Sequence, residues 1–553
     1  MKQLIILILF LSVSFSLFAT DYYVDPVNGD DANDGLSTNT AYQTIYGAFK
    51  GSFPYNYKVA GDTVYLRGGI YTGNVNAVST TLTNSGTFAS PITMAAYPGE
   101  TPVIAGIVSP YVGFQLNGES WYVFDGITWS NCYKHITMTS CTNIVVTNCT
   151  FGWANKTNSM WAGIYIAANS ATVTVQNCTF TDWGQINSDW EDIGTNIQIM
   201  DATTNDSTHA ILIENNTFNH GGHDCLDIRF GASNVVIRNN YFHNEEWMQT
   251  NDYPVVGSDP KGLGLSAYGN RLVELSGGSR ILIESNRFHY AGVHPDSGGG
   301  GQTLDLSGIN NSIIRKNTCA FGWKMGMWLE SGSATNYIYN NVVYGSSELP
   351  EDSLSWRGGI ISSSFNPDTS ASNRIVNNIV WNNDAASSLG EFNSYTLTWN
   401  LLRANFTNDL SDPLMVDATD YYTYDGTGNQ PDFSLQTSSP CIDAGVFLAF
   451  VTSVSGSGTS VVVDDAGYFC DGFDMVNGDV IQFEGSTDTF TLTDVDYATD
   501  TVTLDSSATW TNGQGVSLVY YGSAPDQGAY ESNYTAWPYA PDSPPNRLWW
   551  GVP

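Results

Sequence analysis

The chain of 553 residues carries 19 Lys and Arg against 54 Asp and Glu, a formal net charge of −35 with His neutral. Such a charge repels nucleic acid and anionic membrane surfaces, so we expect neither as a partner. Eight cysteines are too few for a disulfide scaffold of this length. The many glycines and the near absence of helical periodicity predict an all-β protein.

The N-terminus has the pattern of an export signal. Residues 1–19 combine one lysine with an apolar run that ends in small residues, which predicts a signal peptide. No later apolar run is long enough to span a bilayer. We therefore expect a secreted or periplasmic protein without membrane insertion, acting as a monomer.

A short apolar strand, a polar turn and an aromatic or β-branched residue recur through the middle of the chain. Examples are "NIVVTNCTF", "ILIENNTF", "VVIRNNYF", "ILIESNRF" and "RIVNNIVW". The smallest spacings between turns, 22 to 24 residues, predict a β-solenoid whose stacked rungs bury one continuous core. The expected turn residues are Cys149, Cys178, Asn216, Asn240, Asn286, Asn317, Asn341, Asn378 and Asn400.

The residues around these turns have expected roles. Asn tolerates the left-handed backbone, and its amide can bond to the same amide one rung away. The two cysteines are expected to be small core residues on adjacent rungs. Five phenylalanines follow the turns and are expected to stack inside the solenoid: Phe151, Phe180, Phe218, Phe242 and Phe288.

These repeats resemble the right-handed parallel β-helix of the pectate lyase superfamily over residues 21 to 445. The opening "YYVDPVNGDDANDG" with "AGDTVYLRGG" resembles the N-terminal cap of exported β-helix proteins, which shields the first strand edges. We predict a single-stranded right-handed parallel β-helix over residues 20–445, including this cap. The resemblance implies that a polysaccharide lies along one of its faces.

The C-terminal part has a different pattern. "SSPCIDAG" and "APDQGAYE" resemble the closing segment of such proteins, here divided between Gly445 and Ala524. The intervening stretch alternates strictly and turns at Gly and Asp, which predicts an inserted small β-barrel or sandwich over 446–520. Residues 521–553 are expected to form the closing segment and a tail rich in Pro and Trp.

Carboxylates recur in the strands "CLDIR", "RLVEL", "TLDLS" and "MWLES". Period-two alternation places the leucines and isoleucines inside, so the acidic residues point outward in successive rungs. The expected ladder is Asp227, Glu274, Asp305 and Glu330. Like charges about 4.8 Å apart repel, and a metal, a nearby cation or a shared proton would offset this repulsion. If a metal does so, Ca²⁺ is the expected ion.

Long connections at residues 181–196, 243–270, 289–302 and 345–359 enter the strands of the ladder and predict the walls of a cleft. Together with one outward tryptophan of a strand, they supply the expected substrate-binding residues: Trp247, Tyr268, His289, Tyr290, Trp328 and Arg357.

Three functions fit this pattern. A polysaccharide lyase would use the ladder to hold metal and Arg229, Lys261, Arg271 or Lys324 as the base. The segment 221–244 resembles the pectate lyase stretch before the site, although "NEEW" replaces the family's "HDK".

A glycoside hydrolase would pair Asp227, as a catalytic carboxylate, with Glu274 or Asp305. "HDCLDI" resembles the "DDC-AI" motif of polygalacturonases, whose "GHG" and "RIK" signatures are missing. A non-catalytic glycan-binding protein is the third interpretation. Of the three, the lyase is the preferred prediction, with a polysaccharide as its substrate.

Overall fold

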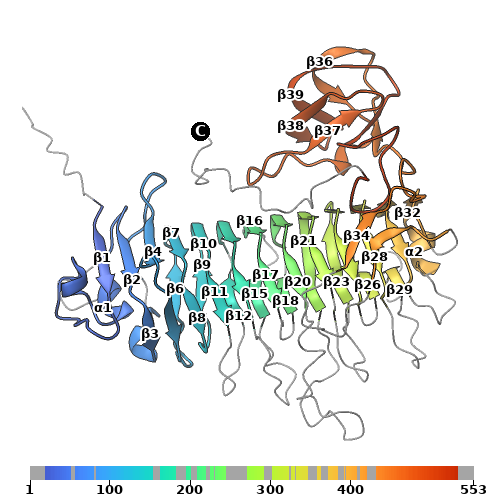
Figure 1. Ribbon diagram of the computed structural model, residues 1–553. Helices are drawn as coiled ribbons and strands as arrows, with labels where there is room; N and C mark the ends of the chain where they lie inside the picture. Colours follow the sequence, from blue (N-terminus) through green and yellow to red (C-terminus); the bar gives the residue numbers. More distant parts are fainter. Residues whose placement is uncertain are drawn as a thin grey trace, which may run out of the picture.

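Short parallel strands are stacked in three columns along one axis, which forms an elongated β-helix (Figure 1). The computed structural model describes residues 19–50, 57–79, 82–152, 162–167, 169–181, 195–200, 208–219, 224–229, 231–243, 271–289, 291, 302–322, 325–330, 332–346, 358–362, 372–383, 391–392, 394–407, 411–419 and 431–532. Residues 1–18, nearly all of the expected signal peptide, lie outside these ranges. Within the described part of the chain, no helix is long and apolar enough to cross a membrane.

Face 1 is the column of strands that contains the predicted acidic ladder. Its strands are β6 (Phe114–Asn117), β9 (Ile136–Thr139), β12 (Ala162–Ile166), β15 (Thr195–Met200), β18 (Asp224–Arg229), the first half of β21 (Arg271–Glu284), β23 (Gln302–Asn310), β26 (Met325–Glu330) and β29 (Gly358–Ser362).

Face 2 follows face 1 in most rungs, and β21 bends from one face into the other. Its strands are β1 (Asp21–Val24), β2 (Thr63–Leu66), β4 (Ile92–Ala96), β7 (Ser120–Asp125), β10 (Thr142–Thr147), β13 (Ala171–Gln176), β16 (His209–Glu214), β19 (Ser233–Arg238), the second half of β21, β24 (Ile313–Arg315), β27 (Tyr337–Tyr339), β30 (Arg374–Val376) and β32 (Leu401–Arg403).

Face 3 completes each rung and forms a separate parallel sheet. Its strands are β3 (Gly69–Thr72), β5 (Pro102–Ala105), β8 (Thr128–Ser130), β11 (Thr150–Gly152), β14 (Thr179–Phe180), β17 (Thr217–Asn219), β20 (Tyr241–His243), β22 (Arg287–His289), β25 (Thr318–Ala320), β28 (Val342–Tyr344) and β31 (Ile379–Trp381).

The core runs the length of the β-helix because each strand alternates inward apolar with outward residues. The predicted phenylalanine stack is confirmed, since all five side chains are buried. The ring centroids of successive members, from Phe151 to Phe288, lie 4.8, 4.6, 4.4 and 5.0 Å apart. Each rung therefore supplies one ring to a continuous aromatic column.

An asparagine ladder closes the turn between faces 2 and 3. The Nδ2 of each member donates to the Oδ1 of the next at 2.9–3.0 Å. The members are Asn216, Asn240, Asn286, Asn317, Asn341, Asn378 and Asn405. Because these amides are away from bulk water, each ladder bond satisfies polar groups that would otherwise destabilise the core.

The last predicted ladder member is wrong. Asn400 belongs to a second ladder between faces 1 and 2, where Asn336 donates to Asn373 at 3.0 Å and Asn373 donates to Asn400 at 2.8 Å. The stretch "YTLTWNLL" begins with helix α2 (Ser394–Trp399) rather than a strand, so the turn asparagine of this rung comes five residues later, at Asn405.

Cysteines continue the first ladder toward the N-terminus. The N–H of Cys178 donates to the Oδ1 of Asn216 at 2.9 Å, and Cys149 lies one rung further along. Both side chains are buried, as predicted. All eight cysteines are buried free thiols.

The N-terminal end of the core is capped by α1 (Ile45–Lys50), with the 3₁₀ turns Thr38–Thr40 and Asn74–Asn76 nearby. Helix α1 buries Ile45, Ala48 and Phe49 in the same cluster as the inward residues of the rungs. The Phe49 ring meets the Phe114 ring edge-on at 5.1 Å. The expected cap is therefore present.

The C-terminal region adds two antiparallel sheets. One is the pair β33 (Met415–Asp417) and β34 (Asp432–Leu435). The other, which we call the antiparallel domain, has the strand order β35-β40-β37-β38-β39-β36 and is consistent with the expected small β module. Its elements are β35 (Ala449–Phe450), β36 (Gly456–Val462), the 3₁₀ turn Ala466–Tyr468, β37 (Val480–Phe483), β38 (Thr489–Asp496), β39 (Thr501–Trp510) and β40 (Gly515–Leu518).

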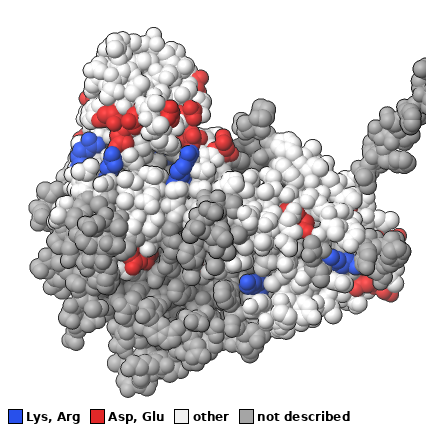
Figure 2. Space-filling view, turned by 180° about the vertical axis from the view of Figure 1, so that it is seen from behind, with Lys and Arg blue, Asp and Glu red and all other residues white. Residues whose placement is uncertain are grey.

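The antiparallel domain packs on face 2. Leu212, Val236, Leu282 and Ile313 on face 2 share one apolar cluster with its core. At the seam, the buried Arg315 bridges Glu284 of face 2 at 2.7 Å and Asp479 of the domain at 2.5 Å. Figure 2 shows basic residues of the β-helix lying below an acidic rim of the domain.

Both ends of the antiparallel domain are anchored at one place. The N–H of Gly445 donates to the carbonyl of Pro525 at 2.8 Å. Asn377, a turn residue of the β-helix, donates from Nδ2 to the carbonyl of Val446 at 2.8 Å, and its own carbonyl accepts from Gly528 at 2.8 Å. The chain thus leaves and rejoins the β-helix at adjacent points.

The closing segment contains the buried carboxyl group of Asp526 and the half-buried carboxyl group of Glu531. Asp526 accepts the N–H of Asp443 at 2.7 Å, and Glu531 accepts the N–H groups of Tyr521 and Asp526, both at 3.1 Å. Burial, reinforced by the nearby Asp526 carboxylate, raises the pKa of Glu531 to about 7.

We expect Asn286→Ala to lower the free energy of unfolding by about 2–4 kcal/mol, because it leaves the buried polar groups of Asn240 and Asn317 without their ladder bonds. The control is Asn177→Gly, which removes an exposed turn amide outside the ladder and keeps its left-handed backbone free of strain. Urea denaturation of both variants measures the free energy of unfolding. Equal losses of this free energy in Asn286→Ala and Asn177→Gly would contradict the prediction.

We expect the stability of the protein to fall between about pH 4.5 and pH 7, in part through Glu531. A raised carboxyl pKa means that the folded chain binds more protons than the unfolded chain in this window, so unfolding becomes easier as the pH rises. Glu531→Gln should flatten the fall, whereas the exposed control Asp488→Asn should not. Melting temperatures of the wild type and both variants, measured across this pH range, test the prediction. An equal fall in Glu531→Gln and the wild type would contradict it.

Candidate functional site

A row of outward positions runs across face 1 in the middle of the β-helix. The strand register pairs Gln198 with Asp227, Asp227 with Glu274, and Glu274 with Asp305. Three of the four predicted ladder members therefore occupy consecutive positions on β18, β21 and β23. Their backbones are spaced at the separation of parallel strands, about 4.8 Å.

Asp227 shows how a strand places a carboxylate in this row. Leu226 and Ile228 on either side are fully buried in the core, as predicted, so the side chain of Asp227 points to the outer side of the β-helix. Although it points outward, the Asp227 side chain is 0% exposed. A short side chain in the interior of a row is shielded by its neighbours, and Gln198 donates from Nε2 to Oδ2 of Asp227 at 3.0 Å.

Asp305 repeats this arrangement two strands further along. It too is 0% exposed, between the buried Leu304 and Leu306. Of Glu274, which lies between the two aspartates, the backbone register alone is described. Among the side chains that the structure describes, no group of three or more His, Cys, Asp or Glu is close enough to hold a metal ion.

The predicted fourth member, Glu330, is not in the row. Asp305 pairs with Trp328, and Glu330 pairs with Ser307 two residues further along the strand. The connection from β26 to the next turn is one residue longer than in the preceding rung, because Trp328 lies 13 residues before Asn341 whereas Asp305 lies 12 before Asn317. Glu330 lies only 11 residues before Asn341, too close to the turn to belong to the row. The row therefore passes from a carboxylate to the half-buried Trp328.

Sequence reasoning missed the start of the row. Gln198 lies in "NIQIM", which has the same alternation as "CLDIR", and this likeness was the signal that could have identified it. Tyr165 precedes Gln198 in the register, and the Lys134 ammonium lies 4.3 Å from the centroid of its ring. Burial lowers the pKa of Lys134, so a partly desolvated cation flanks this end of the row.

The predicted basic residues are only partly placed. Arg229 ends β18 opposite Ser276, and Arg271 begins β21 opposite Asp224. Both therefore belong to strands of the row, and for both the backbone alone is described. Lys261 and Lys324 lie outside the described residues, as do the expected substrate contacts Trp247, Tyr268, Tyr290 and Arg357.

The expected role of His289 in substrate binding is wrong. It ends β22 on face 3, is 1% exposed, and its Nε2 lies 2.9 Å from Oγ1 of Thr318. Its ring packs against Tyr241 and Phe433 at 5.7 and 5.8 Å. Strand β22 extends to residue 289, so His289 belongs to face 3 and not to the long connection that follows. Phe433 of β34 covers its ring, and burial lowers the pKa of the imidazole.

Part of this sequence is similar to that of a known protein. A curated relative, pectate lyase PEL9 of Emericella nidulans, is 36% identical over 91 residues, or 16% of this chain. The chain matches only 20% of the length of that relative.

Two solved structures illustrate the likeness of fold. Pectate lyase Pel9A is 14% identical with a TM-score of 0.49, over 93% of this chain and 96% of that one. The GH136 lacto-N-biosidase from Eubacterium ramulus is 16% identical with a TM-score of 0.42, over 64% and 68%.

A family model described as the right-handed β-helix region matches residues 68–271 and 193–347. These ranges contain the asparagine ladder from Asn216 to Asn341 and the row from Gln198 to Trp328. They extend over more than half of the 553 residues. The chain therefore belongs to the right-handed β-helix family.

Proposed function

We propose that this protein is a secreted polysaccharide lyase that cleaves a uronate-containing glycan by β-elimination on face 1. The observation that carries the proposal is the row Asp227–Glu274–Asp305, in which both described carboxylates are withdrawn from water. Carboxylates gathered at this spacing repel one another unless a ligand or cation offsets them. The pectate lyase PEL9 relative supports the same reaction class.

β-Elimination needs two functions from the protein. The substrate carboxylate must be neutralised, and a base must remove the proton from the neighbouring carbon. Asp227, Glu274 and Asp305 offer the oxygen donors that Ca²⁺ prefers, and a bound Ca²⁺ would supply the neutralising charge. Arg229, Arg271, Lys261 and Lys324 are the candidate bases, and face 1 would orient the chain across the row.

A glycoside hydrolase is the second candidate, favoured by the spacing within the row. Asp227 and Glu274 lie on adjacent strands, about 4.8 Å apart, and Asp227 and Asp305 about twice as far. The first separation is near the 5–5.5 Å of retaining enzymes and the second near the 6.5–9.5 Å of inverting enzymes. Product chemistry separates the two reactions, because only a lyase leaves an unsaturated uronate.

We expect Asp227→Asn to lower activity by about 100-fold or more while the protein stays folded. An amide of the same shape keeps the contact with Gln198 but removes the charge. The matched control is Glu330→Gln, which neutralises a carboxylate on the same face outside the row. Initial rates and melting temperatures of both variants test this; a loss of activity that only follows a loss of folded protein would make the row structural.

We expect digestion of pectate, alginate or another uronate polymer to produce ultraviolet-absorbing unsaturated ends together with reducing ends. EDTA should stop both signals and added Ca²⁺ should restore them, because the row needs a cation to neutralise the substrate. Reducing ends without the absorbance would identify a hydrolase. Neither signal on any uronate or neutral polymer would favour a non-catalytic glycan-binding protein.

A further inference from the structure

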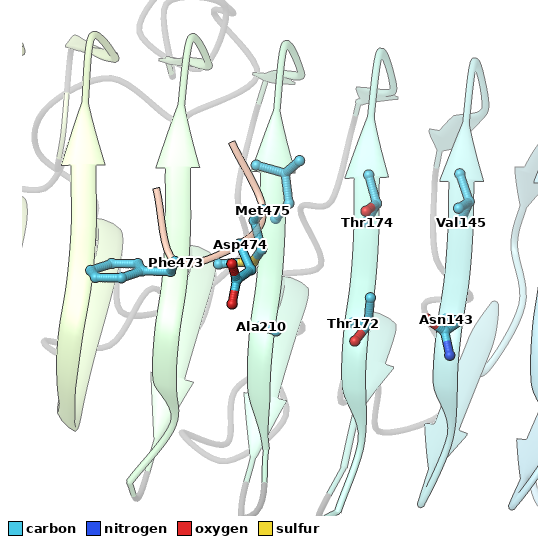
Figure 3. A pocket seen from close by; sticks show the side chains of 9 residues that line it. Asn143, Val145, Thr172, Thr174, Ala210, Phe473, Asp474 and Met475 are labelled. Carbon is cyan, nitrogen blue, oxygen red and sulfur yellow. The ribbon is translucent and has the colours of Figure 1, made fainter. Parts of the chain in front are cut away.

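A cleft of about 110 Å³ lies between face 2 and the antiparallel domain, away from the row on face 1. Its floor is formed by outward residues of β10, β13 and β16, among them Asn143, Thr172 and Thr174. Its wall is the segment Phe473–Met475 of the domain. Figure 3 shows this segment crossing above the strands, with Asp474 above Ala210.

Both sides of the cleft are held in an unusual backbone conformation. Thr172 has a φ of 54°, and Phe473 and Asp474 have consecutive values of 52° and 60°. The left-handed conformation of Thr172 repeats at the same position of the neighbouring rungs, in Trp121, Asn143 and Ala210, so it belongs to the turn of the β-helix. The wall is fixed by Asp471, which accepts the N–H of Phe473 at 2.9 Å, and by the Arg280 guanidinium, 5.0 Å from the Phe473 ring.

An aromatic pair extends the floor toward the N-terminus. Ser120 and Tyr122 pair with Thr142 and Ile144, so Trp121 is the neighbour of Asn143 in the next rung. The ring of Phe88, which is 46% exposed, meets the Trp121 ring edge-on at 5.8 Å. Successive rungs about 4.8 Å apart thus present an aromatic ring, an amide and a hydroxyl.

The charges around the cleft give a charged chain no net attraction. The strands β7, β10 and β13, "SWYVFD", "TNIVVT" and "ATVTVQ", contain no Lys or Arg, and the wall has one charge of each sign, Asp474 and the Arg280 guanidinium that lies against the Phe473 ring. A neutral sugar would instead stack a ring face on Trp121 and donate hydroxyl hydrogens to Asp474, Asn143 and Thr172.

We propose that this cleft and the adjoining Trp121 bind a neutral glycan chain, at a site separate from the one on face 1. The proposal does not depend on the lyase activity. It assigns to the antiparallel domain the wall of a binding site, and it implies that the protein attaches to neutral polysaccharide while face 1 acts on an acidic one.

Affinity electrophoresis of the full chain tests this proposal, in native gels that contain galactomannan, arabinoxylan, mixed-linkage β-glucan or arabinogalactan, with polygalacturonate as the acidic reference. At least one neutral glycan should retard the wild-type protein. Thr172→Ala, Asp474→Ala and Trp121→Ala should each weaken the retardation by about tenfold in affinity, as expected for one lost hydrogen bond or stacking contact. Circular dichroism confirms that each variant is folded.

The matched control is Thr335→Ala, which lies in the same column of left-handed residues on β-helix rungs beyond the cleft, with a φ of 59°. It should bind like the wild type. Asp227→Asn should also keep full binding to the neutral glycan, which separates this site from face 1. Absence of retardation by all four neutral glycans, an equal loss in Thr335→Ala, or a loss in Asp227→Asn would overturn the proposal.

Discussion

The pairing of each turn asparagine with the same residue in the next rung is the constraint on which the molecule depends. A buried amide that both donates and accepts along the axis fixes where face 2 ends and face 3 begins. Because strands change side-chain direction at every residue, a slip of one position would turn the core outward. The ladder therefore sets both the hydrophobic column and the outward row on face 1.

Most of the fold could be predicted because its signals are local. The period of the turns, the Phe151–Phe288 stack and the neighbours Asp227, Glu274 and Asp305 follow from alternation and spacing alone. Errors arose where a rung changes its length. Helix α2 moves the ladder residue from Asn400 to Asn405, and a connection one residue longer than in the preceding rung puts Trp328 in the place expected for Glu330.

Other features depend on contacts between distant parts of the chain, which a periodic pattern does not encode. Asp227 is outward by alternation yet buried, because its burial is decided by neighbouring rungs such as that of Gln198. His289 is covered by β34, which comes more than a hundred residues later. The docking of the antiparallel domain on face 2 through Arg315 and Asp479 is of the same kind.

The hydrogen bonds around Asn377 make the antiparallel domain an insertion that evolution could exchange. Since the chain departs at Gly445 and returns at Pro525 with a hydrogen bond between the two, the β-helix is continuous whatever is placed between them. A different domain with closely spaced termini could be substituted there without disturbing any rung. Recombination at this position could therefore exchange the antiparallel domain for another one and leave the rungs of face 1 intact.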